Sequence, residues 1–321
     1  MTIGYRQGLF HDHDRSSWEG NGARPLSWIA WYPISGDAAQ QKHSSDIPII
    51  IQTRQPCPVV LLSHGTGGAA MGLAWLAERL VRHGFIAIAV NHHGNTAIEP
   101  YRAEGFLCLW ERARDLTVVL DQLLENEQFA DCINRKEIFL GGFSAGAYTA
   151  LQLIGAITKH SQYQLASPIP GATRGPREFP DLVDQLPHLL ANNAVFQTSW
   201  ARMSRDYRDA RFKAALVCAP GRSVLGFDEQ SLGRIDRPAH IVVGRADAVA
   251  PLNDCAVWLK NRIQSSTLEI LTPDVGHYIF LPEATDADRL AAPEVYVDAP
   301  GVNRSIIHDQ IANAAAALFG R

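Results

Sequence analysis

One short segment constrains the fold of this chain more than any other. An apolar run over residues 138–141 leads into a G-x-S-x-G motif at residues 142–146, and a helix-like sequence over 147–153 follows at once. A serine on a turn between a strand and a helix must adopt a strained backbone, which pushes its hydroxyl above the edge of the sheet. The flanking glycines remove Cβ atoms that would collide with the neighbouring elements. The segment therefore predicts a strand, a sharp turn and a helix, with Ser144 as the nucleophile.

A glycine-rich loop earlier in the chain predicts a second part of such a site. Residues 58–63 read as a buried strand that runs into the sequence His-Gly-Thr-Gly-Gly at 64–68. Acyl transfer places negative charge on the oxygen of the attacked carbonyl, and preorganised N–H donors must meet that charge. We expect the backbone N–H groups of Thr66 and Ala145 to be these donors, with an ordinary glycine-rich turn as the alternative. The Asn-His-His-Gly-Asn sequence at 91–95 either supports this loop or forms a structural turn.

Two later loops carry the partners that a serine nucleophile needs. Asp247 lies on the loop that leaves a strand pattern over residues 239–243, and catalytic groups gather at the carboxyl ends of strands in open parallel sheets. His277 follows a glycine on the loop after the strand pattern 267–271. A loop position lets the imidazole swing over Ser144 as a general base. The sequence therefore predicts a triad of Ser144, Asp247 and His277.

Other ionisable residues fit these roles less well. Asp274 lies too close to His277 along the chain to approach its far ring nitrogen easily, and Asp228 precedes its strand. His240 begins a strand at the wrong end, and His308 lies on an amphipathic helical pattern. Asp274 and Asp228 are therefore the rival acids, and the other histidines are expected to be surface or hydrogen-bonded side chains.

These motifs together resemble those of the α/β-hydrolases, and more narrowly those of the platelet-activating-factor acetylhydrolase and "predicted dienelactone hydrolase" group. The resemblance covers about residues 20–285, and its motifs occupy residues 24–33, 63–68, 91–95, 112–123, 142–146, 244–251 and 276–277. It implies a serine that attacks an ester, with oxyanion donors at Thr66 and Ala145. Typical dienelactone hydrolases, however, use a cysteine where this chain has Ser144. The lipid-facing helices of the secreted acetylhydrolases are not evident either.

The order of strand and helix patterns agrees with that fold. Strand patterns occur at residues 27–33, 58–63, 85–90, 137–141, 214–218, 239–243 and 267–271. Helical patterns occur at 72–83, 104–126, 146–158, 252–263 and 304–318. Alternation with continuously apolar inner strands predicts an α/β fold with a mostly parallel, doubly wound sheet. In the helix over 104–126 the leucines have core spacing, so we expect Arg112, Arg114 and Asp115 to be surface or structural residues.

One stretch interrupts this alternation. Residues 159–213 separate the helix after Ser144 from the next strand, and a simple crossover needs far fewer residues. We therefore expect residues 1–158 and 214–321 to form one hydrolase core into which 159–213 is inserted as a helical lid.

An aromatic stripe lies within this inserted stretch. Phe196, Trp200 and Met203 recur on one face of a helical pattern. That face either docks the lid onto the body or lines an acyl pocket. We include these three residues, together with His64 and Phe143, as candidate pocket residues.

Composition agrees with a soluble enzyme. The chain has 321 residues, of which 46% are hydrophobic and 19% charged, enough for a large core. A net charge of −4 without a basic block argues against nucleic acid binding. The sequence begins without an apolar signal segment and contains no apolar run of membrane-spanning length, so no membrane insertion is expected.

The cysteines and a histidine-rich run give no sign of a metal site. The five cysteines are scattered, odd in number and without a C-x-x-C pair. This usage fits reduced thiols in a cytoplasm better than a disulfide framework or a zinc site. The His-Asp-His-Asp run at 11–14 could mimic a metal cluster, but it has no partner motif, so we expect a solvated loop there. No metal or organic cofactor is implied.

Taken together, the sequence predicts a cytoplasmic serine hydrolase that cleaves a small-molecule carboxylic ester with a short or medium acyl group. An amide, a lactone or a thioester is the alternative substrate for the same residues. A non-catalytic ligand-binding module on the same fold is the alternative from another class. The oligomeric state is not indicated.

Overall fold

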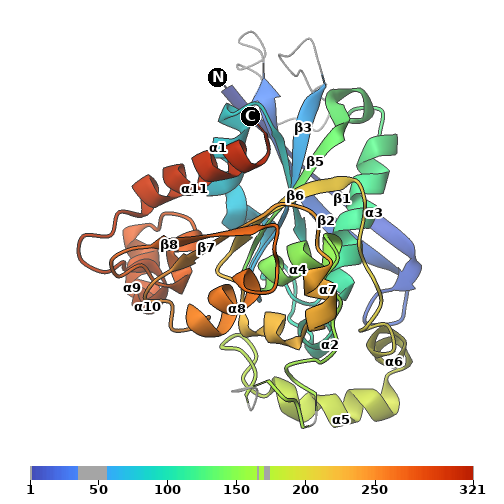
Figure 1. Ribbon diagram of the computed structural model, residues 1–321. Helices are drawn as coiled ribbons and strands as arrows, with labels where there is room; N and C mark the ends of the chain where they lie inside the picture. The colour runs from blue at the N-terminus through green and yellow to red at the C-terminus, as the bar shows by residue number, and fades with distance from the viewer. Residues whose placement is uncertain (1, 35–55, 165, 170–173, 321) are drawn as a thin grey trace.

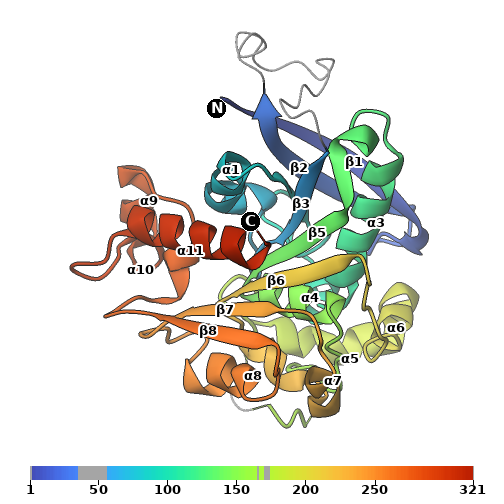
Figure 2. The ribbon, with the colours of Figure 1, turned by 45° about the horizontal axis from the view of Figure 1, so that its top comes forward.

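The computed structural model describes residues 2–34, 56–164, 166–169 and 174–320. In this part of the chain, one eight-stranded sheet has the order β1-β2-β4-β3-β5-β6-β7-β8 (Figure 1 and Figure 2). The strands are β1 (Thr2–Ser16), β2 (Ala23–Ile34), β3 (Cys57–Ser63), β4 (Ile86–Asn91), β5 (Ile133–Phe143), β6 (Phe212–Cys218), β7 (Ala239–Gly244) and β8 (Ser266–Leu271).

Most of the sheet is parallel. The pairs β4–β3, β3–β5, β5–β6, β6–β7 and β7–β8 are parallel, whereas β1–β2 and β2–β4 are antiparallel. All six residues of β4 are buried, as are all but one in β3, because helices cover both faces of these inner strands. That burial accounts for their continuously apolar sequences. The predicted doubly wound, mostly parallel sheet is confirmed.

Two hydrophobic cores lie on the two faces of the sheet. Along β3, Val59 and Leu61 enter one core while Val60 and Leu62 enter the other, as the two-residue period of a strand requires. The first core is covered by α3 (Glu111–Glu125), α4 (Ala145–Leu153), α7 (Glu229–Gly233) and α8 (Trp258–Lys260). The second is covered by α1 (Ala74–Arg82) and α11 (Arg304–Leu318), which pack against each other (Figure 2).

The remaining helical elements are short and lie mostly in the loops at the carboxyl ends of the strands. They are η2 (Ala70–Leu73), α2 (Ala103–Leu107), η3 (Ala130–Cys132), α5 (Leu182–Asn192), α6 (Ala194–Trp200), η4 (Arg222–Gly226), η5 (Asn253–Val257), η6 (His277–Phe280), α9 (Asp286–Ala291) and α10 (Pro293–Tyr296).

The N-terminal residues differ from the sequence expectation. The run at 11–14, predicted as a solvated loop, lies in β1, which forms a long antiparallel hairpin with β2. Asp12 is buried there and accepts a hydrogen bond from Arg15 at 2.6 Å. His11, His13 and Asp14 are exposed as expected, but the run is a strand rather than a loop. The loop prediction was wrong because Asp12 and Arg15, the buried residues at this end of the strand, are charged, and a search for apolar residues misses such a strand.

Two predicted helices also differ in detail. The pattern 104–126 divides into α2 and α3, with a break at Cys108. Arg112 and Asp115 on α3 are buried rather than on the surface, so only the structural part of that expectation holds. The pattern 252–263 forms a π-helical turn, η5, followed by the single turn of α8.

Candidate active site

The turn between β5 and α4 has the strained backbone that its sequence predicts. Ser144 has φ 55° and ψ −112°, a conformation that residues other than glycine rarely adopt. Its N–H donates to the carbonyl oxygen of Cys218 at the end of β6, at 2.9 Å. A non-glycine residue held at positive φ between two buried elements is typical of a functional position.

Close contacts explain both glycines of the motif. A Cβ on Gly142 would lie 2.0 Å from the carbonyl oxygen of Gly146. A Cβ on Gly146 would lie 1.8 Å from the carbonyl oxygen of Ser63, the last residue of β3. Neither methyl group fits, because real Cβ atoms do not approach other atoms within 3 Å. Gly142 therefore lets the turn close on the start of α4, and Gly146 lets the end of β3 and the His64 carbonyl pack against that start.

Two backbone N–H groups without a hydrogen-bond partner among the described residues belong to the cavity that Ser144 lines. Thr66, on the loop after β3, and Ala145, the first residue of α4, line the same cavity as Ser144. Within the described residues, neither N–H donates to a protein acceptor. Thr66 is half-buried, and Ala145 lies in the first turn of α4, where backbone N–H groups have no partner within the helix. Both N–H groups are therefore available to donate to an anionic oxygen in the cavity.

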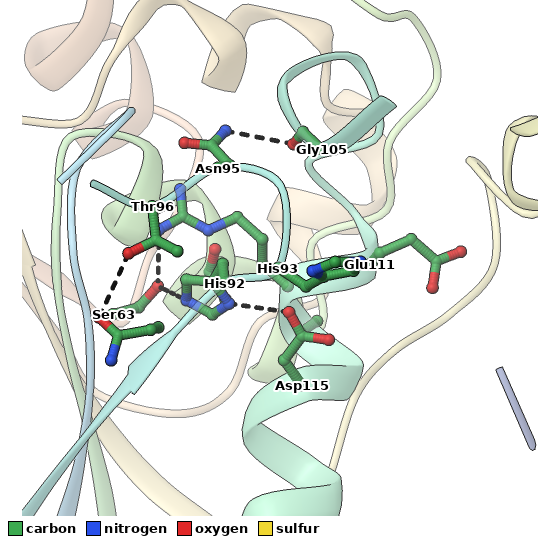
Figure 3. A network of polar contacts seen from close by, with 12 residues as sticks. Ser63, His92, His93, Asn95, Thr96, Gly105, Glu111 and Asp115 are labelled. Atoms are coloured by element: carbon green, nitrogen blue, oxygen red, sulfur yellow. Dashed lines mark hydrogen bonds and ion pairs between the residues drawn. The ribbon is translucent and has the colours of Figure 1, made fainter. Parts of the chain in front are cut away.

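Residues 91–95 hold the loop that carries Thr66. Asn95 Oδ1 accepts a hydrogen bond from the Gly67 N–H at 2.7 Å, and Asn91 Oδ1 accepts one from the Ala70 N–H at 2.7 Å. The Asn95 amide nitrogen donates to the Gly105 carbonyl of α2 at 3.2 Å (Figure 3). The segment is thus a structural turn whose side chains also support the loop of Thr66, so both alternatives hold.

His277 and Asp247 meet from two separate loops. His277 Nδ1 lies 2.7 Å from Asp247 Oδ2, and both side chains are buried. Asp247 Oδ1 accepts hydrogen bonds from the N–H groups of Val249 at 3.0 Å and Ala250 at 2.7 Å. A carboxylate is an acceptor, so these partners assign the proton of the imidazole to Nδ1 and leave Nε2 free to accept one.

Backbone contacts bring these two loops together. The Ala246 N–H donates to the carbonyl oxygen of Val275 at 3.0 Å. The rival carboxylates lie elsewhere: Asp274 is exposed, and Asp228 accepts from the Ser231 N–H at 2.9 Å at the start of α7. In the described part of the chain, Asp247 is the carboxylate that contacts His277.

Ser144 and His277 line one cavity of about 400 Å³ at the carboxyl ends of the strands. Phe143 lines it as the sequence predicts, and its ring centroid lies 5.0 Å from that of His277. Tyr163 and Ile169, from the first part of the 159–213 stretch, also line it. This volume suits a small organic molecule.

Comparison with known proteins identifies the family of this chain. The model of the alpha/beta hydrolase family matches residues 59–292. The chain belongs to the alpha/beta hydrolase family. A comparison of this hydrolase with curated protein sequences gave no match.

Two solved structures are similar to this hydrolase to different degrees. A ferulic acid esterase from Streptomyces cinnamoneus superposes with a TM-score of 0.64 at 16% identity, over 99% of this hydrolase and 88% of that chain. A cold-adapted esterase from an Arctic intertidal metagenomic library has a TM-score of 0.48 at 16% identity, over 92% of each chain. The first likeness supports an alpha/beta hydrolase fold for the whole described chain.

Four residues predicted to line the pocket of this hydrolase do not line the cavity. Phe196, Trp200 and Met203 instead pack in a separate hydrophobic cluster with Trp110. The Trp200 ring meets the Trp110 ring edge-on at 5.4 Å between centroids, so the stripe docks this stretch onto the body. His64 is buried beneath the loop of Thr66. A one-sided apolar pattern shows that a helix face is covered but not what covers it.

The sequence analysis also missed part of the cavity wall. Gly221 and Arg222 follow β6, and Tyr278 follows His277 after β8. Their places after parallel strands could have identified them. Tyr163 and Ile169 lie in a stretch without regular periodicity, so no local signal pointed to them.

The described residues contain no helix with the length and apolar character needed to cross a lipid bilayer.

Proposed function

We propose that this alpha/beta hydrolase is a serine esterase that cleaves carboxylic esters with short or medium acyl groups through an acyl-enzyme. The observation that carries the proposal is the 2.7 Å contact between His277 and Asp247, because His277 lines one cavity together with Ser144 on its strained turn. With the Thr66 and Ala145 N–H groups, these three residues can supply a group for each step of ester hydrolysis, and this supports the proposal.

In the first step, His277 Nε2 takes the proton of the Ser144 hydroxyl as the serine oxygen attacks the ester carbonyl. Asp247 accepts a hydrogen bond from Nδ1–H and stabilises the imidazolium that forms. The carbonyl oxygen becomes negative, and the Thr66 and Ala145 N–H groups donate to it. The imidazolium then gives its proton to the leaving alcohol as the carbon–oxygen bond breaks.

In the second step, water replaces the alcohol. His277 Nε2 takes a proton from water as its oxygen attacks the acyl carbon, and the same two N–H groups bind the second oxyanion. The proton returns to the Ser144 oxygen as the acid leaves. None of these steps requires a metal or an organic cofactor.

The proposal also covers the inserted stretch, the nearer relatives and the cellular location. Tyr163 and Ile169 belong to the 159–213 stretch, which we propose to be a lid inserted between residues 1–158 and 214–321. We also propose the platelet-activating-factor acetylhydrolase and "predicted dienelactone hydrolase" group as the nearer relatives. A cytoplasmic location stays a prediction.

Nitrophenyl esters of graded acyl length test the proposed activity. Each methylene that fits the cavity contributes at most about 0.8 kcal/mol, so kcat/KM is expected to rise gently over short chains. It is then expected to fall where the acyl chain meets the cavity wall. Rates that climb steadily into long-chain lipids would contradict the short-acyl assignment. Binding of esters without turnover would instead favour the non-catalytic module.

Trp200→Ala is expected to lower stability without changing the acyl-length limit. The Trp200 side chain is half-buried against Trp110 and Phe196, so its loss should cost about 2–3 kcal/mol, less than for a fully buried tryptophan. Urea unfolding measures the free energy, and the ester series measures the limit. Ile169→Ala is the matched variant, because Ile169 lines the cavity and its truncation should extend the limit. A longer limit in the Trp200 variant would place that side chain in the pocket after all.

A further inference from the structure

A second serine–histidine–aspartate chain lies beneath the loop of Thr66 (Figure 3). Ser63 Oγ lies 2.9 Å from His92 Nε2, and His92 Nδ1 lies 2.9 Å from Asp115 Oδ2. All three side chains are fully buried, so a substrate does not reach them. Asp115 also accepts hydrogen bonds from Arg15 at 2.7 Å and from Arg24 at 2.9 Å. This chain therefore fastens the ends of β3 and β4 to α3 and the N-terminal hairpin.

Arg112, also on α3, is buried beside this chain but is not paired in the same way. Its Nη2 donates to the carbonyl oxygen of His64 and lies 3.4 Å from Ser63 Oγ. Its Nε and Nη1 have no hydrogen-bond partner among the described residues. Arg112 forms no ion pair within them either, because Asp115 is already occupied by Arg15, Arg24 and His92. Burial lowers the pKa of Arg112 to about 9, although the charge of Asp115 opposes this change.

A buried cation without a paired carboxylate destabilises a fold, because it loses its hydration and gains no equivalent partner. Buried polar atoms without partners are uncommon in folded proteins, and each one calls for a specific explanation. A purely structural role does not account for Arg112, since an apolar side chain of similar length would fill the same space at a lower cost in desolvation.

The carbonyl held by Arg112 lies close to the turn that carries Ser144. A Cβ on Gly146, in the turn of Ser144, would lie 2.9 Å from the His64 carbonyl oxygen. The His64 peptide also leads directly into the loop of Thr66. Arg112 therefore binds a backbone carbonyl at the point where this loop packs against the turn of Ser144.

Hydrogen bonds of the His64 ring also influence the direction of the Thr66 N–H. His64 Nε2 accepts a hydrogen bond from the His92 N–H at 3.3 Å, so its proton lies on Nδ1, which donates to the Gly65 carbonyl oxygen at 2.7 Å. The Gly65 carbonyl and the Thr66 N–H belong to one planar peptide group, so fixing one fixes the direction of the other.

We propose that Arg112 is a positioning residue of the oxyanion hole: it holds the His64 carbonyl against the nucleophile turn, and its guanidinium lies 3.4 Å from Nδ1 of the His64 ring. The inference rests on the proposed function. A protonated His64 would turn a second N–H toward the His92 N–H and lose that bond. Arg112 and Asp115 from α3 and His92 after β4 are the charged and titratable groups that face His64. Burial first, then Arg112 and His92, holds its pKa well below the ordinary value, and Asp115 acts in the opposite direction.

Arg112→Met separates positioning from structure. We expect kcat for a nitrophenyl ester to fall on the order of 10- to 100-fold, because a displaced oxyanion donor costs that much or more. KM should stay within about twofold of the native value, since the ester carbonyl gains charge only in the transition state. The unfolding midpoint should be unchanged or higher, because the unpaired buried charge is gone.

Two control variants complete the test. Arg112→Lys keeps a charge and one donor, so it should recover most of the lost kcat. Arg114→Met removes the neighbouring arginine, which pairs with Asp12 and Asp14 on the hairpin, and should leave kcat unchanged. Native kcat in Arg112→Met would overturn the inference. So would a loss of kcat that Lys does not recover and that accompanies a lowered unfolding midpoint. In either case, activity of the native enzyme leaves the proposed function intact.

Ring nitrogen NMR of His64 provides a readout that does not need activity. The inference predicts a protonated Nδ1 and an unprotonated Nε2 in the native protein across the acid range in which it stays folded. In Arg112→Met, His64 should begin to protonate at a higher pH. If the native chain hydrolyses no ester, the proposed function fails, and these spectra still show whether Arg112 controls His64. An unchanged His64 titration in the variant would contradict that control.

Discussion

Replacing Ser144 by alanine is expected to reduce kcat for ester hydrolysis on the order of 10⁶-fold. The hydroxyl oxygen is the only atom removed, and in the proposed mechanism this oxygen is the one that attacks the ester carbonyl. Residual turnover should come from these N–H groups and from substrate binding alone. Steady-state assays with the best nitrophenyl ester measure the loss.

The fold of the Ser144 variant should remain intact. Alanine tolerates φ 55° about as poorly as serine does, so the strain of the turn is unchanged. Thermal unfolding should therefore stay close to that of the native protein. Ser204→Ala, which changes an exposed serine outside the cavity, is the matched control and should retain native kcat. A Ser144 variant that is well folded and hydrolyses esters at the native rate would remove Ser144 from the mechanism.

Asp247→Asn should lower kcat on the order of 10⁴-fold. The asparagine oxygen can still accept from the Val249 and Ala250 N–H groups, so the loop keeps its shape. Its NH₂ group then faces His277 Nδ1, which must become an acceptor. The ring proton moves to Nε2, and the base that should accept the Ser144 proton is lost.

Asp274→Asn is the matched control for this variant. Asp274 lies three residues from His277 in sequence but is exposed, and only Asp247 forms the observed hydrogen bond. The control should keep native kcat. If Asp274→Asn lost activity while Asp247→Asn kept it, the acid of the triad would be Asp274 and the geometry described above would not be the active one.

The parts of the site that are local in sequence could be predicted from it. The turn of Ser144 follows from glycines whose Cβ atoms would meet backbone within 2.0 Å, and such contacts leave a short, fixed motif. Asp247 and His277 could be placed because each follows a strand pattern, and parallel strands bring their carboxyl ends to one edge. These predictions use only nearest neighbours along the chain and the rule for parallel sheets.

The features that depend on contacts between residues far apart in the chain could not be predicted from the sequence. Trp200 and Phe196 show the same helical period whether they face a cavity or Trp110, and only the tertiary packing decides between them. In the sequence, Arg112 and Asp115 have the pattern of surface charges on an amphipathic helix. Arg15 and Arg24 bind Asp115 from about 90 to 100 residues away, so no neighbouring residue indicates that this face is buried. The edge strand β1 was not predicted either, because its buried charges, Asp12 and Arg15, have partners on α3 far along the chain.

Covalent labelling with a fluorophosphonate tests the central claim most directly. The tryptic peptide 137–159 contains Ser144 as its only serine, so a mass shift on that peptide identifies the site without ambiguity among serines. We predict one label per chain on this peptide, lost in Ser144→Ala and greatly slowed in Asp247→Asn. A label on any other peptide, or no label on an ester-hydrolysing native protein, would contradict the assignment of Ser144 as the nucleophile.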